Sequence, residues 1–504
     1  MSCRTKFPVV FIHGVFGYGK THPLWNWWLP YWPERVLEHL NPNHVITEVG
    51  ILSSDHDRAC EVFFQVYGGT VDYGEEHALR VGHERFGRVY AQGAFPQWNQ
   101  ENPVHLVGHS FGATTAIELY QLLCKDAFHV GSNYKWVRSI TCIAGPLSGT
   151  TLTHALGVRE DSVTRYGIAH MLSIAINIWF KLAHDYPILN NVWDIRMDQW
   201  KSQTASFSSA FSHANPVLRS LDLAVFSAVP AIRVRLNGTL ENMDKLHLLS
   251  IATSAGNMAI PFKEITLVVG LLFLFMVSRA NQSANRLQCI LSCVRQYRRG
   301  RTLTAGILLL LLGGRVSMFN YAKSPTMYWL SWLIRRASRK LHELSSKGLD
   351  FDTWNHNDGA VNIHSMLYPR MAKPAAALEE SLLSSQKRKD IRESTSESTD
   401  AGTDDPELID DTEKCLDASA LLSRCASHLS LDSLTCNSEI SSARDNSTVP
   451  QFMSETSKAR LQKGHWYVYR VDSNHLTGMF WDGEAVSLYQ NLFRLIAHHY
   501  EASN

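Results

Sequence analysis

The sequence lacks an excess of charge of either sign and lacks the cysteine patterns that mark a metal or redox site. Its 504 residues carry 48 lysines and arginines against 47 aspartates and glutamates, so no overall field favours nucleic acid, and we expect no nucleic-acid partner. The nine cysteines are odd in number and scattered, and none form a CxxC pair. We expect them to be mostly reduced.

Two further absences concern export and membranes. Residues 1–7 lead directly into an apolar segment without the parts of a secretory signal, which favours an intracellular or membrane-associated protein over a secreted one. The apolar runs 265–278 and 302–314 both fall short of the roughly 20 residues that a membrane-spanning helix needs. We interpret them as buried or interfacial helices and leave peripheral or integral membrane association open.

Short apolar runs that end at a glycine or just before one are present instead. Residues 7–13, 104–107 and 140–144 are rich in β-branched side chains, which is typical of buried strands. Residues 114–125 have apolar positions at helical spacing directly after the second run. The succession of strand, tight turn and helix predicts an α/β fold with a mostly parallel central sheet.

The composition changes to serine, threonine and charged residues between residues 373 and 458. Such a segment has too little apolar surface to offset the entropy of ordering, so we predict a disordered insertion. Strand-like and helix-like patterns return at residues 464–471 and 485–500. The folded domain is therefore expected to close across a long loop, whose entropic cost grows only slowly with length.

The sequence Gly108-His109-Ser110-Phe111-Gly112 lies between the second strand-like run and the helix-like stretch. Small residues on either side of a serine permit the sharp strand-to-helix turn that exposes the hydroxyl of a nucleophile elbow. The pentapeptide alone is a weak signal, because chance matches are common. In this context it predicts an α/β-hydrolase with Ser110 as the nucleophile.

A serine nucleophile needs oxyanion donors, an acid and a base. One donor in this fold is the N–H after the nucleophile, here Phe111, and the loop His13-Gly14-Val15 fits the second, through the Val15 backbone. The acid and then the histidine follow later in the chain; Asp358 lies in a turn-forming cluster, and His475 follows a strand-like run. The local sequence alone does not distinguish Asp358 and His475 among the 47 acidic residues and 23 histidines of the chain.

Residues 14–21 (GVFGYGKT) present a competing pattern, because they match GxxxxGK[ST] after a strand. A phosphate-binding loop must open a helix whose N–H groups hold the phosphates. Here proline and bulky aromatics follow, which make a poor helix start, and we recognise no strand that ends in a Mg²⁺-binding aspartate. A P-loop NTPase is therefore kept as a distant alternative.

A tryptophan-rich stretch follows the same loop. Its side chains could line an apolar acyl site or could belong to the core or a docking surface. The residues are Trp25, Trp27, Trp28 and Trp32.

Several longer strings resemble, in order, those of the zinc-containing thermoalkalophilic bacterial lipases and their plant relatives. They are residues 50–61 (GILSSDHDRACE), 68–74 (GGTVDYG), 85–87 after His77 and His83, 108–112, 143–152 (IAGPLSGTTL), 192–200 (VWDIRMDQW), 357–362 (NDGAVN) and the late pair His475-Leu476. The resemblance covers most of residues 7–224, and then about 326–370 and 464–500. Unusual strings in a shared order are far more specific than GxSxG.

The resemblance implies an enzyme of the triacylglycerol lipase type, which hydrolyses lipid esters at a membrane or oil–water interface. Ser110, Asp358 and His475 match the family's triad, and Val15 and Phe111 match its oxyanion positions. Residues 166–181 fit the helical lid of these lipases, although a plain core helix is the alternative.

The resemblance also implies a zinc site that pins an insertion above the active site. Asp57, His77 and His83 match three ligands, and Asp222 plausibly matches the fourth. Two imidazoles and two carboxylates suit a closed tetrahedral zinc ion, which would be structural rather than hydrolytic.

This sequence departs from the family in two places. A calcium site near the catalytic histidine is doubtful, because Asp482 matches one ligand but Thr477 stands where a glutamate is expected. Residues 225–325 do not resemble the family, which supplies core strands there. They are either a lineage-specific, membrane-associating insertion or material absent from the mature protein.

The sequence thus predicts an α/β-hydrolase with a helical lid, a zinc-pinned insertion and a long disordered insertion. We expect hydrolysis of acylglycerols or related lipids through an acyl-enzyme. A catalytically silent lipid- or membrane-binding protein on the same fold is the alternative. The expected division is residues 1–224, the first part of the hydrolase; 225–325, a divergent insertion; 326–372, the part with the catalytic aspartate; 373–458, the disordered insertion; and 459–504, the part with the catalytic histidine.

Overall fold

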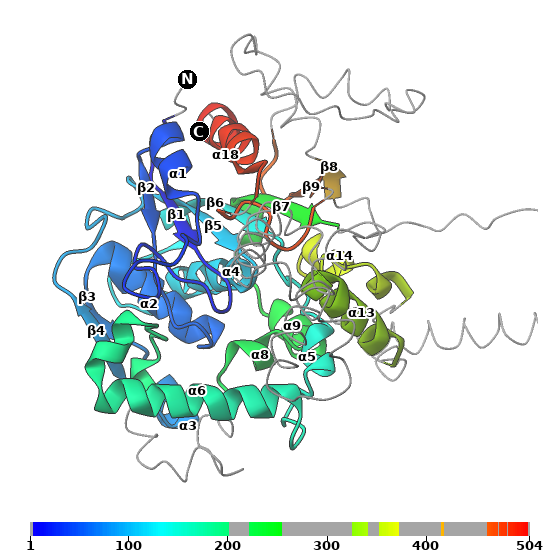
Figure 1. The fold of residues 1–504 in the computed structure, drawn as a ribbon. Helices are drawn as coiled ribbons and strands as arrows, with labels where there is room; N and C mark the ends of the chain where they lie inside the picture. The colour runs from blue at the N-terminus through cyan, green and yellow to red at the C-terminus, as the bar shows by residue number, and fades with distance from the viewer. Residues whose placement is uncertain are drawn as a thin grey trace, which may run out of the picture.

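A computed structural model describes residues 4–200, 221–254, 325–340, 352–371, 415–417, 461–471, 473–480 and 482–501 (Figure 1). A seven-stranded sheet lies at its centre, in the order β2-β1-β5-β6-β7-β9-β8, and each neighbouring pair is parallel. The strands are β1 Val9–Ile12, β2 His44–Ile46, β5 Val104–His109, β6 Val137–Ile143, β7 His247–Thr253, β8 Cys415–Asp417 and β9 Trp466–Val471. The expected parallel sheet is confirmed.

Helices cover both faces of this sheet, as buried parallel strands require. A separate antiparallel pair consists of β3 Gly69–Asp72 and β4 Phe86–Tyr90. The α-helices are α1 Glu34–Leu40, α2 Asp55–Tyr67, α3 Glu75–Val81, α4 Phe111–Cys124, α5 Leu152–Ala155, α6 Ile168–Asp185, α8 Ala224–Ser227, α9 Pro230–Asn237, α13 Pro325–Lys340, α14 Ile363–Met366 and α18 Ala485–Leu495. Short 3₁₀ turns are η1 Tyr134–Trp136, η2 Pro187–Asn191, η5 Met243–Lys245 and η8 Asp352–Asn355, and α18 continues as the π-helix Ile496–Tyr500.

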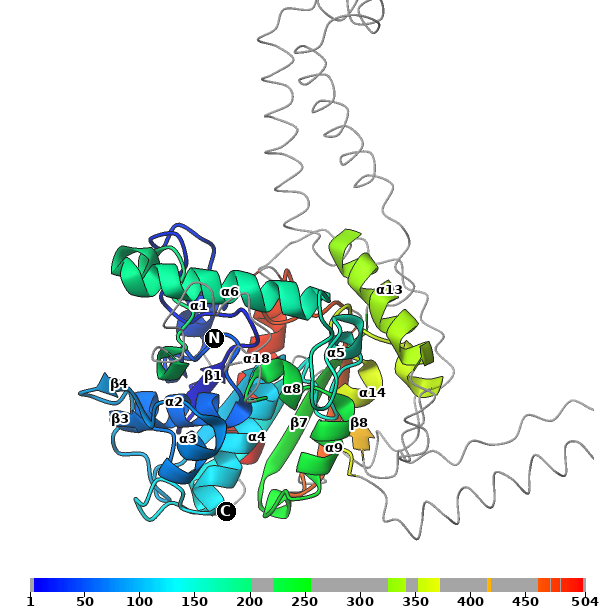
Figure 2. The same ribbon diagram turned by 90° about the horizontal axis from the view of Figure 1, so that it is seen from below.

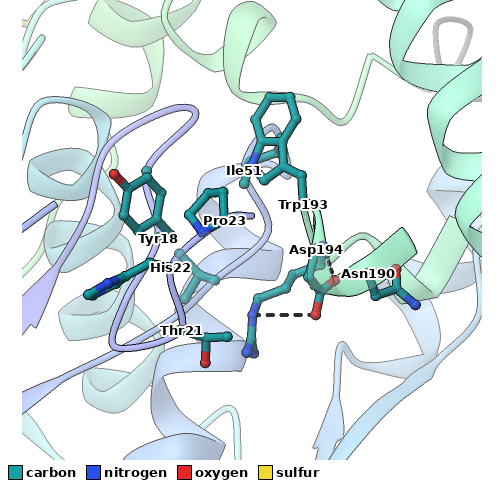
Figure 3. Close-up of a pocket in the computed structure, with 11 residues that line it drawn as sticks. Tyr18, Thr21, His22, Pro23, Ile51, Asn190, Trp193 and Asp194 are labelled. Carbon is teal, nitrogen blue, oxygen red and sulfur yellow. Dashed lines mark hydrogen bonds and ion pairs between the residues drawn. The ribbon is translucent and has the colours of Figure 1, made fainter. Parts of the chain in front are cut away.

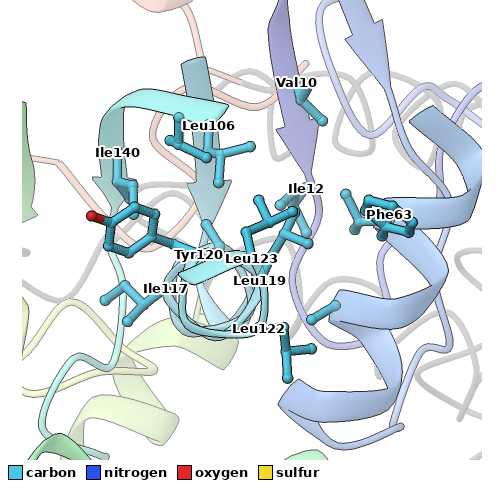
Figure 4. Packing of buried hydrophobic residues seen from close by; sticks show 14 of the residues in the cluster. Val10, Ile12, Phe63, Leu106, Ile117, Leu119, Tyr120, Leu122, Leu123 and Ile140 are labelled. Atoms are coloured by element: carbon cyan, nitrogen blue, oxygen red, sulfur yellow. The ribbon is translucent and has the colours of Figure 1, made fainter. Parts of the chain in front are cut away.

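The strand sequences alternate between two hydrophobic clusters because successive side chains point to opposite faces. Val10 and Ile12 of β1 pack with α2 and α4, and Figure 4 shows them facing Leu119, Leu123 and Phe63. On the other face, β1 and β7 pack with the terminal helix α18 and with α1. The buried side chains of that second cluster include Val9, Phe11, Leu249, Ile251, Leu488, Leu492 and Phe493.

Helix α6 lies outside these layers, along one side of the molecule (Figures 1 and 2). Phe180 of α6 belongs to a third buried cluster with Ile51, and Ile176 and Val15 pack against it. The helix predicted for residues 166–181 is therefore present as α6, and it shares a hydrophobic cluster with Val15 of the loop that follows β1.

The structure also differs from the sequence-based expectation in two elements. Strand β7 lies within residues 225–325, which we expected to lack core strands, yet all seven of its residues are buried between β6 and β9. That expectation was wrong for His247–Thr253. Strand β8, Cys415–Asp417, pairs with β9 inside the segment expected to be disordered.

Most of the residues on which the membrane-related and disorder predictions depend are not described by the structure. The apolar runs 265–278 and 302–314, and most of residues 373–458, lie outside the described residues. Among the helices that the structure does describe, none combines the length and the apolar character needed to cross a bilayer.

Candidate active site

Ser110 lies on a sharp turn between β5 and α4. Its backbone has φ 54° and ψ −129°, a conformation that residues with a side chain rarely adopt. The flanking glycines are required by packing: a Cβ on Gly108 would lie 2.2 Å from the carbonyl oxygen of Gly112, and one on Gly112 would lie 2.1 Å from that of Ile12. The GxSxG spacing thus lets the helix start against the sheet while the serine side chain turns outward.

The structure brings Ser110, His475 and Asp358 into one hydrogen-bonded chain. Nε2 of His475 lies 2.8 Å from Oγ of Ser110, and its Nδ1 lies 2.8 Å from Oδ2 of Asp358. Ser110 follows β5, His475 follows β9, and Asp358 follows η8. Asp358 also accepts a hydrogen bond from Thr253 at the end of β7. The three residues meet at the carboxyl edge of the parallel sheet, where α/β proteins build their sites.

Asp358 is fully buried, and several donors stabilise its charge. Oδ1 accepts the backbone N–H groups of Ala360 at 2.9 Å and Val361 at 2.8 Å, and Oδ2 accepts the hydroxyl of Thr253 at 2.6 Å. Burial by itself raises the pKa of Asp358, but the charge of His475 and the hydrogen bonds outweigh it and hold that pKa below its usual value. The carboxylate is therefore ionised and able to orient the imidazole.

The two residues predicted to supply the oxyanion donors, Val15 and Phe111, lie on different elements. Phe111 begins α4, and Val15 lies on the loop after β1; neither N–H has an acceptor among the described residues. Gly14 brings this loop against the serine, because a Cβ there would lie 2.7 Å from Cβ of Ser110. This arrangement has the form of an oxyanion hole.

The segment that matches a phosphate-binding loop is built differently from one. No helix begins at Thr21, and the N–H of Thr21 donates to Oε1 of Glu48 at 2.6 Å, where a phosphate would need that donor. Figure 3 shows a small pocket beside it, in which the carboxylate of Asp194 lies across from Thr21. The geometry argues against the NTPase alternative.

The four tryptophans divide between the core and the surface. Trp32 is buried against Phe11 and Tyr31, whereas Trp27 is 90% exposed and Trp25 and Trp28 are about half exposed. The N–H groups of Leu24 and Trp25 donate to the carbonyls of Val192 and Asn191, just after α6. The exposed tryptophans therefore lie beside the end of α6.

A second cluster brings together all four residues expected to bind a metal. Asp57 of α2, His77 of α3, His83 and Asp222 each offer a ligand atom, and these atoms lie within 4.8 Å of one another. Nε2 of His83 is buried 3.3 Å from Oδ2 of Asp57 without an aligned hydrogen bond. This buried group of imidazoles and carboxylates can hold a metal ion.

The donor set fits a cation on electrostatic grounds. Burial and the neighbouring charge of Asp57 raise the pKa of Asp222, whereas the two imidazoles lower that of Asp57 against the effect of its burial. Nδ1 of His83 donates to the carbonyl of Glu84 at 2.8 Å, so a neutral ring directs the lone pair of Nε2 into the cluster. Binding through Nε2 of His77 would require its Nδ1, which now accepts from Arg80 at 3.0 Å, to gain a proton.

The residues near the doubtful calcium site already have partners. The carboxylate of Asp482 accepts the N–H of Gly478 at 2.7 Å and that of Glu484 at 3.0 Å, and the hydroxyl of Thr477 donates to the carbonyl of Asn474. These contacts stabilise a turn after His475 and neither require nor exclude an ion.

Two residues that support the candidate sites were not predicted from the sequence, one beside the triad and one in the metal cluster. Thr253, at the end of β7, contacts Asp358, and Gln199 donates to Asp57 at 2.7 Å in the metal cluster. Nothing in their local sequence distinguishes them. The one signal that could have been used is the position of Thr253 after the mostly apolar run HLLSIA, which is typical of a buried strand.

Comparison with known proteins connects the first third of the chain to lipases. Residues 5–174 match the family model described as "Lipase-like, C-terminal domain". Lipase 2 of Staphylococcus aureus is 34% identical over 178 residues, which cover 31% of this chain and 25% of that protein, and a lipase of Staphylococcus epidermidis is 29% identical over 183 residues, with the same coverage. The chain thus spans about a quarter of the length of these relatives. The resemblance to bacterial lipases is confirmed.

Solved structures extend the likeness of the fold over nearly the whole chain. Lipase 1 from Pelosinus fermentans aligns with a TM-score of 0.53 at 20% identity, covering 98% of this chain and 99% of that one. Staphylococcus hyicus lipase aligns with a TM-score of 0.52 at 17% identity, covering 99% and 97%. These structures, together with the parallel sheet and its flanking helices, confirm the α/β-hydrolase fold.

Proposed function

We propose that the protein hydrolyses carboxylic esters of lipids, with Ser110 as nucleophile, His475 as general base and acid, and Asp358 as the group that orients His475. The observation that carries the proposal is the unbroken chain of two 2.8 Å contacts from Ser110 Oγ through the imidazole to the buried Asp358. The similarity of residues 5–174 to bacterial lipases supports it independently. The same intact chain argues against a catalytically silent binding protein.

The geometry supports a two-step reaction. Nε2 of His475 takes the proton of Ser110 as Oγ bonds to the ester carbon, and then donates it to the departing alcohol as the C–O bond breaks, which leaves an acyl-serine. In the second step, Nε2 takes a proton from water as its oxygen bonds to the acyl carbon. The proton returns to Oγ of Ser110, and the fatty acid leaves.

The charge that develops in both steps has partners in the fold. The N–H groups of Val15 and Phe111 stabilise the oxyanion, and because they belong to a loop and a helix start, they need no reorganisation when the charge forms. The ionised Asp358 stabilises the imidazolium while Nε2 carries the proton.

We further propose that α6 is a lid and that the enzyme acts at a lipid–water interface. Exposed apolar side chains on α6, directly before and after it, and on the tryptophan loop support this, since single solvent-exposed residues are common but a group of them is not. They include Trp25, Trp27, Trp28, Tyr166, Ile168, Met171, Tyr186 and Ile188. Phe180 of α6 belongs to the hydrophobic cluster against which Ile176 and Val15 pack, so opening of the lid would disturb the packing beside the Val15 loop.

The metal of the buried cluster is proposed to be zinc in a structural role. Asp57, His77, His83 and Asp222 would complete a tetrahedral set with no position left for water. A zinc ion there would offset the two buried carboxylates and join α2, α3 and the segment before α8. The proposal gives the ion no part in ester hydrolysis.

The test is hydrolysis of p-nitrophenyl esters of increasing acyl length by the protein and by its Ser110→Ala variant. We expect activity that rises with acyl length and falls at least about 1,000-fold in the variant. Gly483→Ala is a suitable control, because a Cβ at Gly483 would meet no atom within 4 Å. Equal rates for the protein and Ser110→Ala would exclude the enzyme and favour a lipid-binding role.

A further inference from the structure

A second hydrogen-bonded chain lies behind Ser110 and involves none of the side chains of Ser110, His475 and Asp358. The N–H of Gly14 donates to the hydroxyl of Tyr31 at 2.9 Å, this hydroxyl lies 2.6 Å from Nδ1 of His109, and Nε2 of His109 lies 2.7 Å from the backbone carbonyl of His475. Tyr31 and His109 are both buried. The chain joins the loop of the oxyanion donors to the loop of the base.

The direction of each hydrogen bond in this chain is fixed by its ends. The carbonyl of His475 can only accept, so Nε2 of His109 carries the proton. In a neutral imidazole Nδ1 is then an acceptor, and the hydroxyl of Tyr31 must donate to it while accepting from Gly14. Every donor and acceptor is used once.

The electrostatic setting keeps both groups in these protonation states. Burial lowers the pKa of His109 to about 3, with a further lowering by His475, and burial raises the pKa of Tyr31 well above its usual value. The chain therefore stays intact when His475 becomes positively charged during catalysis. A protonated His109 would break it, because Nδ1 could no longer accept.

The backbone around the base is held from both sides. The N–H of His475 donates to the carbonyl of Asp358 at 3.2 Å, and the N–H of Phe480 donates to the carbonyl of Tyr31 at 3.0 Å. Together with His109, these bonds define where the imidazole of His475 stands relative to the loop of Gly14 and Val15.

We propose that Tyr31 and His109 are positioning residues, which hold the oxyanion loop at Gly14 and the carbonyl of His475 at a fixed separation on either side of Ser110. This inference rests on the proposed esterase function. Neither residue touches the reacting atoms. Their loss should misplace the base relative to the oxyanion donors, which lowers the rate of the chemical steps more than the binding of substrate.

The test compares Tyr31→Phe, His109→Leu, His109→Gln and the unaltered protein with a soluble p-nitrophenyl ester. Tyr31→Phe removes one oxygen atom and two bonds of the chain, and we expect kcat to fall roughly 10- to 100-fold with KM changed less than about twofold. The kcat of His109→Leu should decrease to the same extent. His109→Gln, whose amide at the ε position can donate to the carbonyl of His475, should recover most of the rate.

His105 provides the matched control. It lies on the same strand, is equally buried and is hydrogen-bonded to Ser139 at 2.7 Å, but at the opposite end of β5 from Ser110. His105→Leu should lower the melting temperature and leave the kcat of the folded fraction, titrated with a phosphonate ester, within about twofold of the unaltered protein.

The outcomes separate the two proposals. An active protein whose Tyr31→Phe variant keeps its kcat, or loses it only as far as His105→Leu does, overturns the positioning role while the esterase stands. An equal loss in His109→Leu and His109→Gln also overturns it. A protein no more active than Ser110→Ala overturns the proposed function and this role with it.

Discussion

The hydroxyl of Thr253 donates a 2.6 Å hydrogen bond to Oδ2 of Asp358, the same oxygen that lies 2.8 Å from Nδ1 of His475. Thr253 is the last residue of β7, which lies between β9, the strand before the His475 loop, and β6, the neighbour of the elbow strand β5. Oδ2 of Asp358 thus contacts both the imidazole of His475 and a side chain at the end of a sheet strand. The sheet itself fixes the orientation of the acid.

Thr253→Val should lower kcat by about tenfold and leave the fold intact. Valine keeps the shape but removes the hydrogen bond to a charged acceptor, which contributes on the order of 1.5–3 kcal/mol. The pKa of Asp358 should rise, because a bond that stabilises its charged form is lost. Steady-state kinetics check the rate, and Thr253→Ser, which retains the hydroxyl, should stay near the unaltered value.

Gly14→Ala should abolish the proposed esterase activity. The added Cβ would lie 2.7 Å from Cβ of Ser110 and 3.1 Å from both its Oγ and the hydroxyl of Tyr31. The oxyanion loop must then move away from the nucleophile, and we expect kcat/KM to fall at least about 100-fold, as for the loss of an oxyanion donor. A Gly14→Ala enzyme with normal kcat/KM would show that this loop does not set the geometry of the site.

Removal of the metal should destabilise the protein without direct loss of chemistry. An ion bound at about a thousand times its Kd adds roughly 4 kcal/mol, so chelation should lower Tm by about 10 °C. His83→Ala should show the lower Tm from the start and no further decrease with chelator. Differential scanning calorimetry with added Zn²⁺ or Ca²⁺ identifies the ion; recovery with calcium alone would contradict the assignment of zinc.

His109 should make the protein more sensitive to acid. Its pKa is lowered to about 3 in the folded state but is near 6.5 in an unfolded chain. The unfolded chain therefore binds the proton first, and stability falls as the pH decreases from about 6.5 toward 3. In His109→Gln this contribution to the acid sensitivity is absent. Between pH 7 and 4.5, the unaltered protein should therefore lose roughly 2–3 kcal/mol more of its free energy of unfolding than the variant does.

Denaturant unfolding at both pH values measures this difference. His39→Gln, a substitution in the last turn of α1, is the control and should follow the unaltered protein. A His109→Gln variant with the same acid dependence as the unaltered protein would contradict this prediction, because it would show that the pKa of His109 is not lowered in the folded state.

The parts of the site that depend on short sequence motifs could be predicted from the sequence. Ser110 was recognisable because an elbow needs glycine at two fixed positions, and the structure shows both glycines facing backbone atoms. Strand β7 was missed because HLLSIAT is not directly followed by a glycine, as the recognised strands are, and lies within a region without resemblance to the family. Thr253, Tyr31 and Gln199 could not be found, since their roles depend on contacts across the fold rather than on neighbours in sequence.

The tryptophan loop leads to the last prediction. Trp27 is 90% exposed and lies on a loop whose N–H groups bond to the carbonyls of Asn191 and Val192 beyond α6. Trp27→Ser should leave Tm and the hydrolysis of a soluble ester unchanged, because an exposed side chain contributes little to folding. Adsorption to neutral phosphatidylcholine vesicles or a triacylglycerol emulsion should weaken several-fold, since an interfacial tryptophan places its apolar ring among the headgroups.

Val89→Ser is the matched control, because Val89 is 69% exposed on β4 in the separate antiparallel pair. Co-sedimentation with vesicles gives the bound fraction of each variant, and the soluble ester reports the intact site. If both variants adsorb equally well, the tryptophan loop has no part in binding the interface. If only Trp27→Ser is impaired, the tryptophan loop belongs to the lipid-binding surface, next to the segment after α6 to which its backbone is hydrogen-bonded at Asn191 and Val192.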